Sequence, residues 1–227
     1  MRFIYLDIET LPSQDKAMAD RIRANIKPPG QYKKPESIAE WMAANAEAAV
    51  TEEIGKTALD GLYGSICCIG WAIDDQPVQT EYIGSCIETP NEGALIDFVF
   101  DQIDDASSDT QSNSRMPLIV VGHNVEFDIR FLFQRCVRHG IRIPQAIRHA
   151  FDYTSRPDYT DTMRIWAGYK GYVKLKDLAR ELLGDAGDDI DGSQVANVWA
   201  ADPLSVATHC AQDVERVRAL HNLMRVL

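Results

Sequence analysis

The feature that most constrains the fold is a short apolar segment near the start of the chain that ends in two carboxylates. Residues Phe3 to Leu6 are all apolar, so an extended segment here is hydrophobic on both faces. This pattern is typical of a central strand in a sheet that is covered on both sides. The expected strand, Arg2 to Ile8, therefore predicts a layered α/β fold. Asp7 and Glu9, two residues apart, point to the same side at its end.

Those two like charges need a positive partner. A central strand has no structural reason to end in two carboxylates on one side, and a divalent cation is the simplest group that offsets their repulsion. Asp7 and Glu9 are therefore candidate metal ligands.

The rest of the chain predicts a mixed sheet flanked by helices. Strands are expected at 65–73, 78–83 and 117–121, and helices at 92–103, 127–139, 174–183 and 203–224. The polar segments 104–115 and 185–192 are predicted to be loops, and the chain after Tyr153 is predicted to be mainly helical.

Residues 12–60 differ in composition, being rich in Ala, Lys and Glu. Pro35 is typical of the first turn of a helix, and a second helix is expected from Thr51 to Leu59. We interpret this stretch as a helical insertion at the edge of the fold. A chain of 227 residues is enough for one sizeable domain, so residues 1–227 are predicted to form a single domain that includes the insertion.

Two further places carry carboxylates where strands and helices can converge. Asp128 lies in the first turn of the helix expected after the 117–121 strand; alone, it is more simply explained by a favourable interaction with the helix dipole. His209 and Asp213 are four residues apart on one face of the last helix, which also fits a surface ion pair. Together with Asp7 and Glu9, these residues supply hard oxygen ligands that suit Mg²⁺ or Mn²⁺. Two such ions can clamp the attacking and leaving oxygens of a phosphoryl transfer.

The same residues resemble a known family. Asp7-Ile8-Glu9-Thr10, the stretch from Gly122 to Asp128, and the stretch from His209 to Asp213 are similar, in order and separation, to the three exonuclease motifs of the DEDD (DnaQ-like) superfamily. Asp161-Thr162-Met163 and residues 175–183 and 191–195 add a resemblance to the predicted exonucleases similar to the proofreading domain of family B DNA polymerases. The resemblance covers about 1–11 and 62–225.

The resemblance implies a ribonuclease H-like fold and hydrolysis with two divalent cations, Mg²⁺ or Mn²⁺, held by Asp7, Glu9, Asp128 and Asp213. Its substrate would be the 3′ end of a single-stranded nucleic acid, with DNA favoured over RNA, and its products nucleoside 5′-monophosphates. It also implies that Thr10, Leu11, Asn124 and Phe127 bind the substrate. Asn124 in an Asx turn and Leu11 as a cap on the core are the structural alternatives.

His209 departs from the family pattern. One subfamily has Tyr four residues before the last Asp, and another has His five residues before it, where this chain has Thr208. We hypothesise that His209 occupies the Tyr position, orients the attacking water and takes its proton. The alternative is an impaired enzyme that has become a nucleic-acid-binding module on the same fold. A Ca²⁺-stabilised structural domain needs ligands in one loop, whereas these lie on three separate elements.

Several other residues have structural interpretations that we prefer. Asp161 is predicted to cap a helix at 162–167. Trp166, Tyr169 and Tyr172 could stack on bases, but core packing is favoured at these spacings. The basic stretch from Arg130 to Arg148 fits a solvated helix face and a phosphate-contacting one equally well.

The amino-acid composition limits the partners and the location that are expected of this protein. A net charge of −11 argues against a long nonspecific nucleic-acid surface, but not against an enzyme that holds only a strand end. Five cysteines, none spaced C-x-x-C, predict buried thiols rather than disulfides or zinc. The sequence has no apolar run that could span a membrane and no signal peptide at Met1, so a cytoplasmic location is expected. Protein partners are left open.

Overall fold

The computed structural model describes residues 2–109, 114–115, 117–152, 158–185, 187 and 190–225. The chain forms two compact units: unit 1 comprises Met1–Glu9 and Ile66–Leu227, and unit 2 comprises Thr10–Ser65. Unit 2 interrupts the sequence of unit 1, as expected of a helical insertion near residues 12–60. Whether the two units act as one domain stays a prediction. No helix within the described ranges is long and apolar enough to cross a membrane.

Unit 1 is built on a five-stranded mixed sheet with the order β3-β2-β1-β6-β7. The strands are β1 (Arg2–Leu11), β2 (Ser65–Ile73), β3 (Gln79–Tyr82), β6 (Leu118–Gly122) and β7 (Tyr159–Asp161). β1 pairs in parallel with β6, and β6 with β7, whereas β2 and β3 form an antiparallel hairpin. β1 is therefore the central strand, as its apolar sequence predicts, and it continues to Leu11.

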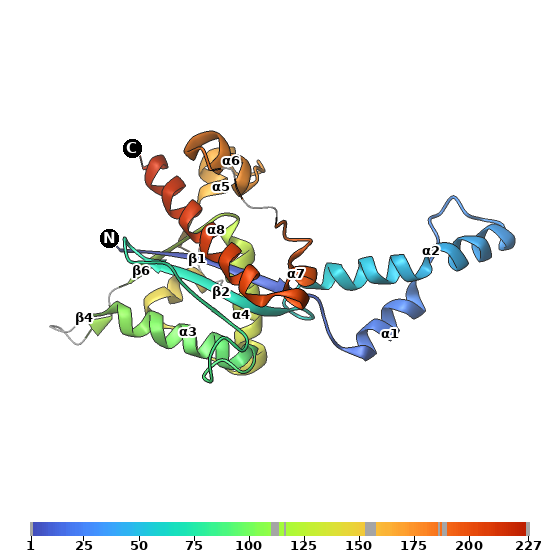
Figure 1. The fold of residues 1–227 in the computed structure, drawn as a ribbon, viewed down its shortest axis with the longest axis horizontal. Coiled ribbons are helices and arrows are strands. Elements are labelled where there is room, and N and C mark those ends of the chain that lie inside the picture. Colours follow the sequence, from blue (N-terminus) through green and yellow to red (C-terminus); the bar gives the residue numbers. More distant parts are fainter. Residues whose placement is uncertain are drawn as a thin grey trace. The chain divides into compact units, whose positions relative to one another are not determined.

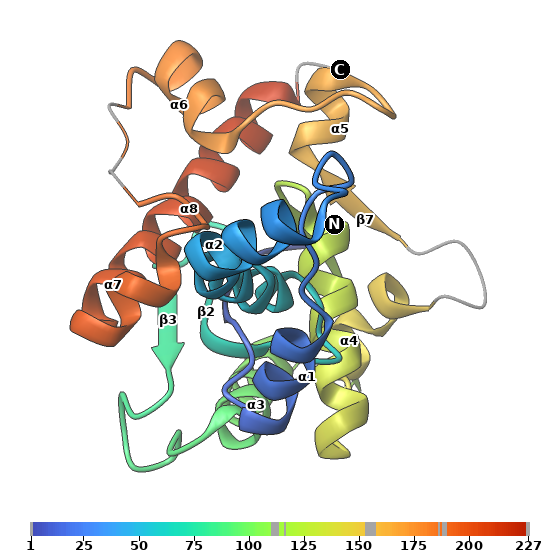
Figure 2. The same cartoon turned by 90° about the vertical axis from the view of Figure 1, so that its right-hand side faces the viewer.

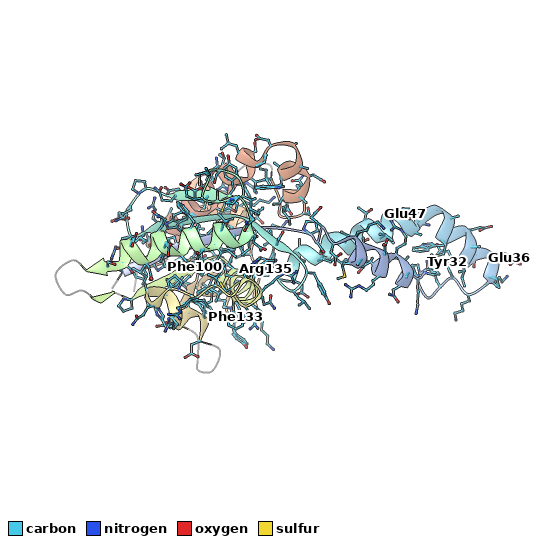
Figure 3. The ribbon with its side chains drawn as sticks, turned by 90° about the horizontal axis from the view of Figure 1, so that it is seen from below. Tyr32, Glu36, Glu47, Phe100, Phe133 and Arg135 are labelled. Atoms are coloured by element: carbon cyan, nitrogen blue, oxygen red, sulfur yellow. The ribbon has the colours of Figure 1, made fainter. Side chains whose placement is uncertain are left out.

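Helices cover both faces of this sheet (Figures 1 and 2). On one face, Ile4, Leu6 and Ile8 of β1 join a core with α3 (Glu92–Ser107), α4 (Val125–His139) and the 3₁₀ segment η2 (Gln145–Phe151). Figure 3 labels Phe100 on α3 and Arg135 on α4. On the other face, Tyr5 of β1 packs with residues of α8 (Pro203–Met224) and with α6 (Leu175–Leu183). Alternate residues of β1 thus point to opposite layers.

The remaining elements of unit 1 are short. They are the strands β4 (Ser108–Asp109) and β5 (Ser114–Arg115), which pair with each other, and the helices α5 (Thr162–Ala167) and α7 (Val195–Ala201). α5 has the predicted bounds, and Asp161 caps it by accepting from the amides of Met163 and Arg164.

Three of the sequence-based predictions need correction. β7 was not predicted, because three residues give no readable alternation and the strand is stabilised only by pairing with β6. The expected 104–115 loop is partly regular, because α3 continues to Ser107 and the strands β4 and β5 pair within this range. The separate helix expected at 51–59 is the end of one longer helix, α2 (Pro35–Lys56), followed by the 3₁₀ segment η1 (Thr57–Leu59). Residues 110–113 of the first predicted loop and residues 186, 188 and 189 of the second lie outside the described residues.

Unit 2 is a helical hairpin of α1 (Lys16–Asn25) and α2. The guanidinium of Arg23 donates to both carboxylate oxygens of Glu47, at 3.2 and 3.1 Å, and the rings of Tyr32 and Trp41 lie 6.3 Å apart (Glu47 and Tyr32 are labelled in Figure 3). The two ends of the hairpin meet where the Ser13 amide donates to Thr57 Oγ1 at 2.8 Å.

Candidate active site

The C-terminal half of β1 carries the first two carboxylates. Asp7 and Glu9 lie on the same side of the strand as Tyr5, which packs against α8. Glu9 is buried and Asp7 is partly buried. The side chains of both residues therefore point to the layer that contains α8.

Asp128 reaches β1 from the first turn of α4. A sharp turn joins β6 to this helix: Asn124 has a left-handed backbone (φ 59°), and a Cβ on Gly122 would lie 2.6 Å from Val125 Cγ2. Asp128 is only 4% exposed, and its Oδ1 accepts from the amide of Ile8 at 3.2 Å. It therefore contacts the central strand between Asp7 and Glu9, beyond any interaction with the helix dipole.

α8 supplies the third part of the site. His209 and Asp213 lie one turn apart, and His209 Nε2 is 3.4 Å from Glu9 Oε1 and 3.7 Å from Asp213 Oδ2. The sulfur of Cys210 lies 3.6 Å from the carbonyl oxygen of Asp7. The helix approaches the sheet this closely because β2 has a glycine beneath it, Gly70, whose Cβ would lie 2.8 Å from that sulfur.

The converging carboxylates perturb one another. Burial raises the pKa of Asp7 well above its ordinary value, and the charges of Glu9, Asp128 and Asp213 raise it further. Burial raises the pKa of Asp128 to about 8 despite the hydrogen bond from Ile8. These shifts mean that full ionisation of the cluster is costly without a cation.

Two residues that the sequence analysis did not single out also contribute charge. Arg216 Nη1 donates to Asp213 Oδ1 at 2.6 Å, and its Nε donates to Asp185 Oδ2 at 2.8 Å. The available signal was the spacing of Asp213 and Arg216, three residues apart in a helix, which is typical of an ion pair. Arg216 thus neutralises and orients Asp213.

Asp161 supports the turn that presents Asp128. Besides capping α5, its Oδ1 accepts from the amide of Asn124 at 3.0 Å, and its negative charge contributes to the raised pKa of Asp128. The predicted helix-capping role is confirmed, and the same carboxylate also holds the left-handed backbone of Asn124.

The donor set fits a hard divalent cation, but the ligands do not form a closed cage. Within the described residues, no group of three or more His, Cys, Asp and Glu side chains has the geometry to hold a metal ion. The carboxylate oxygens are nonetheless the ligand type that Mg²⁺ and Mn²⁺ prefer, and a cation would relieve the repulsion that raises the pKa of Asp7.

The predicted substrate-binding residues are divided between the two units. Asn124 is exposed and its side chain makes no capping hydrogen bond, so it does not form the alternative Asx turn that caps α4. Phe127 is half-buried and packs on Phe131, with ring centroids 5.7 Å apart. Thr10 and Leu11 belong to unit 2, where Thr10 Oγ1 donates to the carbonyl oxygen of Ala58 at 2.8 Å.

One structural preference from the sequence is wrong. Trp166, Tyr169 and Tyr172 are 54, 81 and 73% exposed, so they do not pack in the core. The reason is that α5 is short, and buries only its first turn, Thr162 and Met163. The basic stretch on α4 is mixed: Arg135 is buried against Glu92, at 2.6 Å, whereas Arg130 is exposed and lies 3.7 Å from Glu126.

The thiols follow the prediction. All five cysteines are free, and four of them, Cys67, Cys68, Cys136 and Cys210, are buried. Burial raises the pKa of the Cys136 thiol to about 12, so this group is an inert part of the core.

The mixed sheet, its flanking helices and the acidic cluster at the end of the central strand define an α/β domain of the ribonuclease H-like class. The sequence profile of the RNase_H superfamily matches residues 53–225, and the chain belongs to this superfamily. Membership indicates a nuclease, and nucleases of this class generally use divalent metal ions. The chain matches no curated protein. The matched range begins after β1, so Asp7 and Glu9 are linked to the site by the structure rather than by the profile.

Proposed function

We propose that this protein is a 3′→5′ exonuclease that removes nucleoside 5′-monophosphates from the 3′ end of single-stranded nucleic acid, with DNA favoured over RNA. The observation that carries the proposal is the convergence of Asp7, Glu9, Asp128 and Asp213 from β1, α4 and α8. The three segments that carry these carboxylates resemble the DEDD exonuclease motifs, which supports digestion from the 3′ end. The resemblance to the proofreading domain of family B DNA polymerases favours DNA as the substrate.

The four carboxylates would hold two divalent cations, Mg²⁺ or Mn²⁺. When bound, the cations supply charge stabilisation for the attacking and leaving oxygens of the phosphodiester. The amide of Ile8 holds Asp128, and Arg216 holds Asp213, so the chain orients two of the ligands from outside the cluster.

We infer that His209 takes the proton of the attacking water. Its Nε2 lies between Glu9 and Asp213, whose negative charges would stabilise the imidazolium that forms when the ring takes a proton. The same two carboxylates would orient the ring.

A second candidate is a nucleic-acid-binding module that has lost turnover. It is favoured by two contacts: Arg216 already neutralises Asp213, and His209 lies between two of the four carboxylates. Both contacts compete with a cation for the same oxygens.

The discriminating experiment uses 5′-labelled single-stranded DNA and RNA oligonucleotides with Mg²⁺ or Mn²⁺. We expect a ladder that shortens from the 3′ end, with nucleoside 5′-monophosphates as products. Asp7→Ala should abolish it, whereas Asp101→Ala, which removes an exposed carboxylate from α3, should not. Oligonucleotide binding without a ladder in either metal would favour the binding module instead.

A further inference from the structure

An exposed segment rich in aromatic and basic residues follows Asp161, the residue that caps α5. From Thr162 to Lys176 the chain has four basic residues and no acidic one, although the protein carries a net charge of −11. The three exposed rings, Trp166, Tyr169 and Tyr172, are interspersed among these cations, which are Arg164, Lys170, Lys174 and Lys176. We call residues 164–176 the aromatic segment.

Two glycines build the turn that displays these rings. Gly168 ends α5 with a φ of 80°, a conformation that side chains with a Cβ rarely adopt. The amide of Gly171 donates to the carbonyl oxygen of Gly168 at 3.1 Å, and a Cβ on Gly171 would lie 2.0 Å from the carbonyl oxygen of Ala167. The backbone therefore folds tightly and projects Tyr169 and Lys170 outwards.

The aromatic segment is tied at both ends to the turn that presents Asp128. At its start, Arg164 forms an ion pair with Glu126, in the first turn of α4. Near its end, His123 Nε2 donates to the carbonyl oxygen of Val173 at 2.8 Å. These two contacts give the segment a defined position beside the candidate active site. The helix that leads into it, α5, has six residues and is only about 9 Å long.

The exposed groups match the chemistry of a single nucleic-acid strand. Aromatic faces stack on bases whatever their sequence, and basic side chains neutralise the phosphates between them. The guanidinium carbon of Arg164 lies 5.8 Å from the centre of the Tyr169 ring, which stacks a cation on the aromatic face. Lys174 and Lys176 each lie 3.6 Å from Asp191, whose carboxylate partly offsets their positive charge.

We propose that Trp166, Tyr169 and Tyr172 form a stacking platform for the nucleotides that precede the 3′ end of a single-stranded substrate, with Lys170 neutralising a phosphate. This inference rests on the proposed function for the direction of the strand. The exposed rings and Lys170 would give a protein with a net charge of −11 a place to hold a polyanion.

The test compares Tyr169→Ala/Tyr172→Ala with Tyr169→Phe/Tyr172→Phe, which keeps both aromatic faces. Binding of fluorescein-labelled dT15 is measured by anisotropy in EDTA, so that metal-dependent cleavage does not interfere. The alanine pair should raise Kd at least about tenfold, and the phenylalanine pair should stay within about twofold of the wild type. Lys170→Ala should lower the slope of log Kd against log salt by about 0.7.

Turnover separates this proposal from the proposed function. The preference of the wild type for dT15 over the dinucleotide pdTpdT should fall about tenfold in the alanine pair, because the dinucleotide has only one nucleotide before its 3′ end to stack on the platform. Equal dT15 binding by the wild type and the alanine pair would overturn the platform while leaving exonuclease activity intact. Tyrosine-dependent binding without nucleotide release would retain the platform and reject the exonuclease.

Discussion

At the residue scale, the site is governed by the repulsion between its converging carboxylates. The fold places Asp7 beside three other carboxylates and shields it from much of the solvent, and both effects raise its pKa. Arg216 offsets part of this charge by its ion pair with Asp213, and His209 Nε2 lies 3.4 Å from Glu9 Oε1. Arg216 contacts Asp213 from outside the cluster and orients that carboxylate. His209 lies between Glu9 and Asp213, within the cluster, where we propose that it takes the proton of the attacking water.

His209→Ala provides the sharpest test of the proton-transfer role. We expect the rate of nucleotide release to fall by about 10²- to 10⁴-fold, because the water loses the group that takes its proton. Mg²⁺ binding, measured as the rise in Tm over EDTA, should survive because the four carboxylates remain. His221→Ala, which removes the other buried imidazole of α8, is the matched control and should leave the rate much less affected. An unchanged rate in His209→Ala would remove this residue from the mechanism.

Glu92 gives a residue-scale prediction about stability and pH. Burial raises the pKa of Glu92, but hydrogen bonds from Arg135, the Ile66 amide and His139 outweigh this effect, so the pKa lies below its ordinary value of 4.5. The ionised form therefore stabilises the fold above pH 4.5, and this contribution is lost as the pH falls through the lower folded value.

Glu92→Gln should consequently destabilise the protein by about 3–5 kcal/mol at pH 7, because it leaves the Arg135 charge buried without its carboxylate. The difference from the wild type should shrink as the pH falls below 4.5, which chemical denaturation at several pH values would measure. Glu88→Gln, at an exposed position, should change stability by less than about 0.5 kcal/mol. A difference that does not depend on pH would refute the ionisation argument.

At the element scale, the approach of α8 to the sheet decides whether the site assembles. Gly70 of β2 provides the space: a Cβ there would lie 2.8 Å from Cys210 Sγ and 3.0 Å from Val214 Cγ2. Glycine weakens a strand interior, so its presence here reflects close packing rather than strand propensity.

Gly70→Ala should therefore move α8 outwards and lower both stability, by about 1–3 kcal/mol, and nuclease activity. Adding Cys210→Ala removes the sulfur that the new methyl group would meet, and should partly restore both properties. Thermal unfolding and nucleotide release from a labelled strand are the measurements. If the second substitution gives no recovery, close packing of Cys210 is not the reason for glycine at position 70.

The helices and strands differ in how well the sequence predicted them. The bounds of β2 and α8 followed from sequence, because an apolar β-branched run and an Asp-Pro helix start are local signals. β7 was missed because its stability comes from pairing with β6. The exposure of Tyr169 was also misjudged, because aromatic spacing indicates a potential core face but does not show whether a neighbouring element covers it.

At the scale of the whole molecule, unit 2 offers a test of modularity. The chain enters and leaves its helical hairpin at adjacent points, because the Ser13 amide contacts Thr57 Oγ1 at 2.8 Å. Replacing residues 14–56 by a short Gly-Ser linker should therefore leave unit 1 folded, with a cooperative thermal transition and less helical signal in circular dichroism.

The same deletion assigns a role to unit 2. If single-strand binding by the deletion variant weakens while unit 1 stays folded, the insertion helps to hold nucleic acid. Unchanged binding would assign the insertion to another task. Loss of the cooperative transition would contradict the modular interpretation itself.

The sequence alone determined the local and periodic features of this protein. These are the central strand, the helix starts at Pro35 and Pro203, the capping role of Asp161, and the candidate carboxylates. These features can be predicted from the sequence because each depends on residues that lie close together in the chain. Only the tertiary structure decided that Asp128 contacts Ile8, that Arg216 holds Asp213, and that the rings after α5 are exposed, because these depend on which elements pack together.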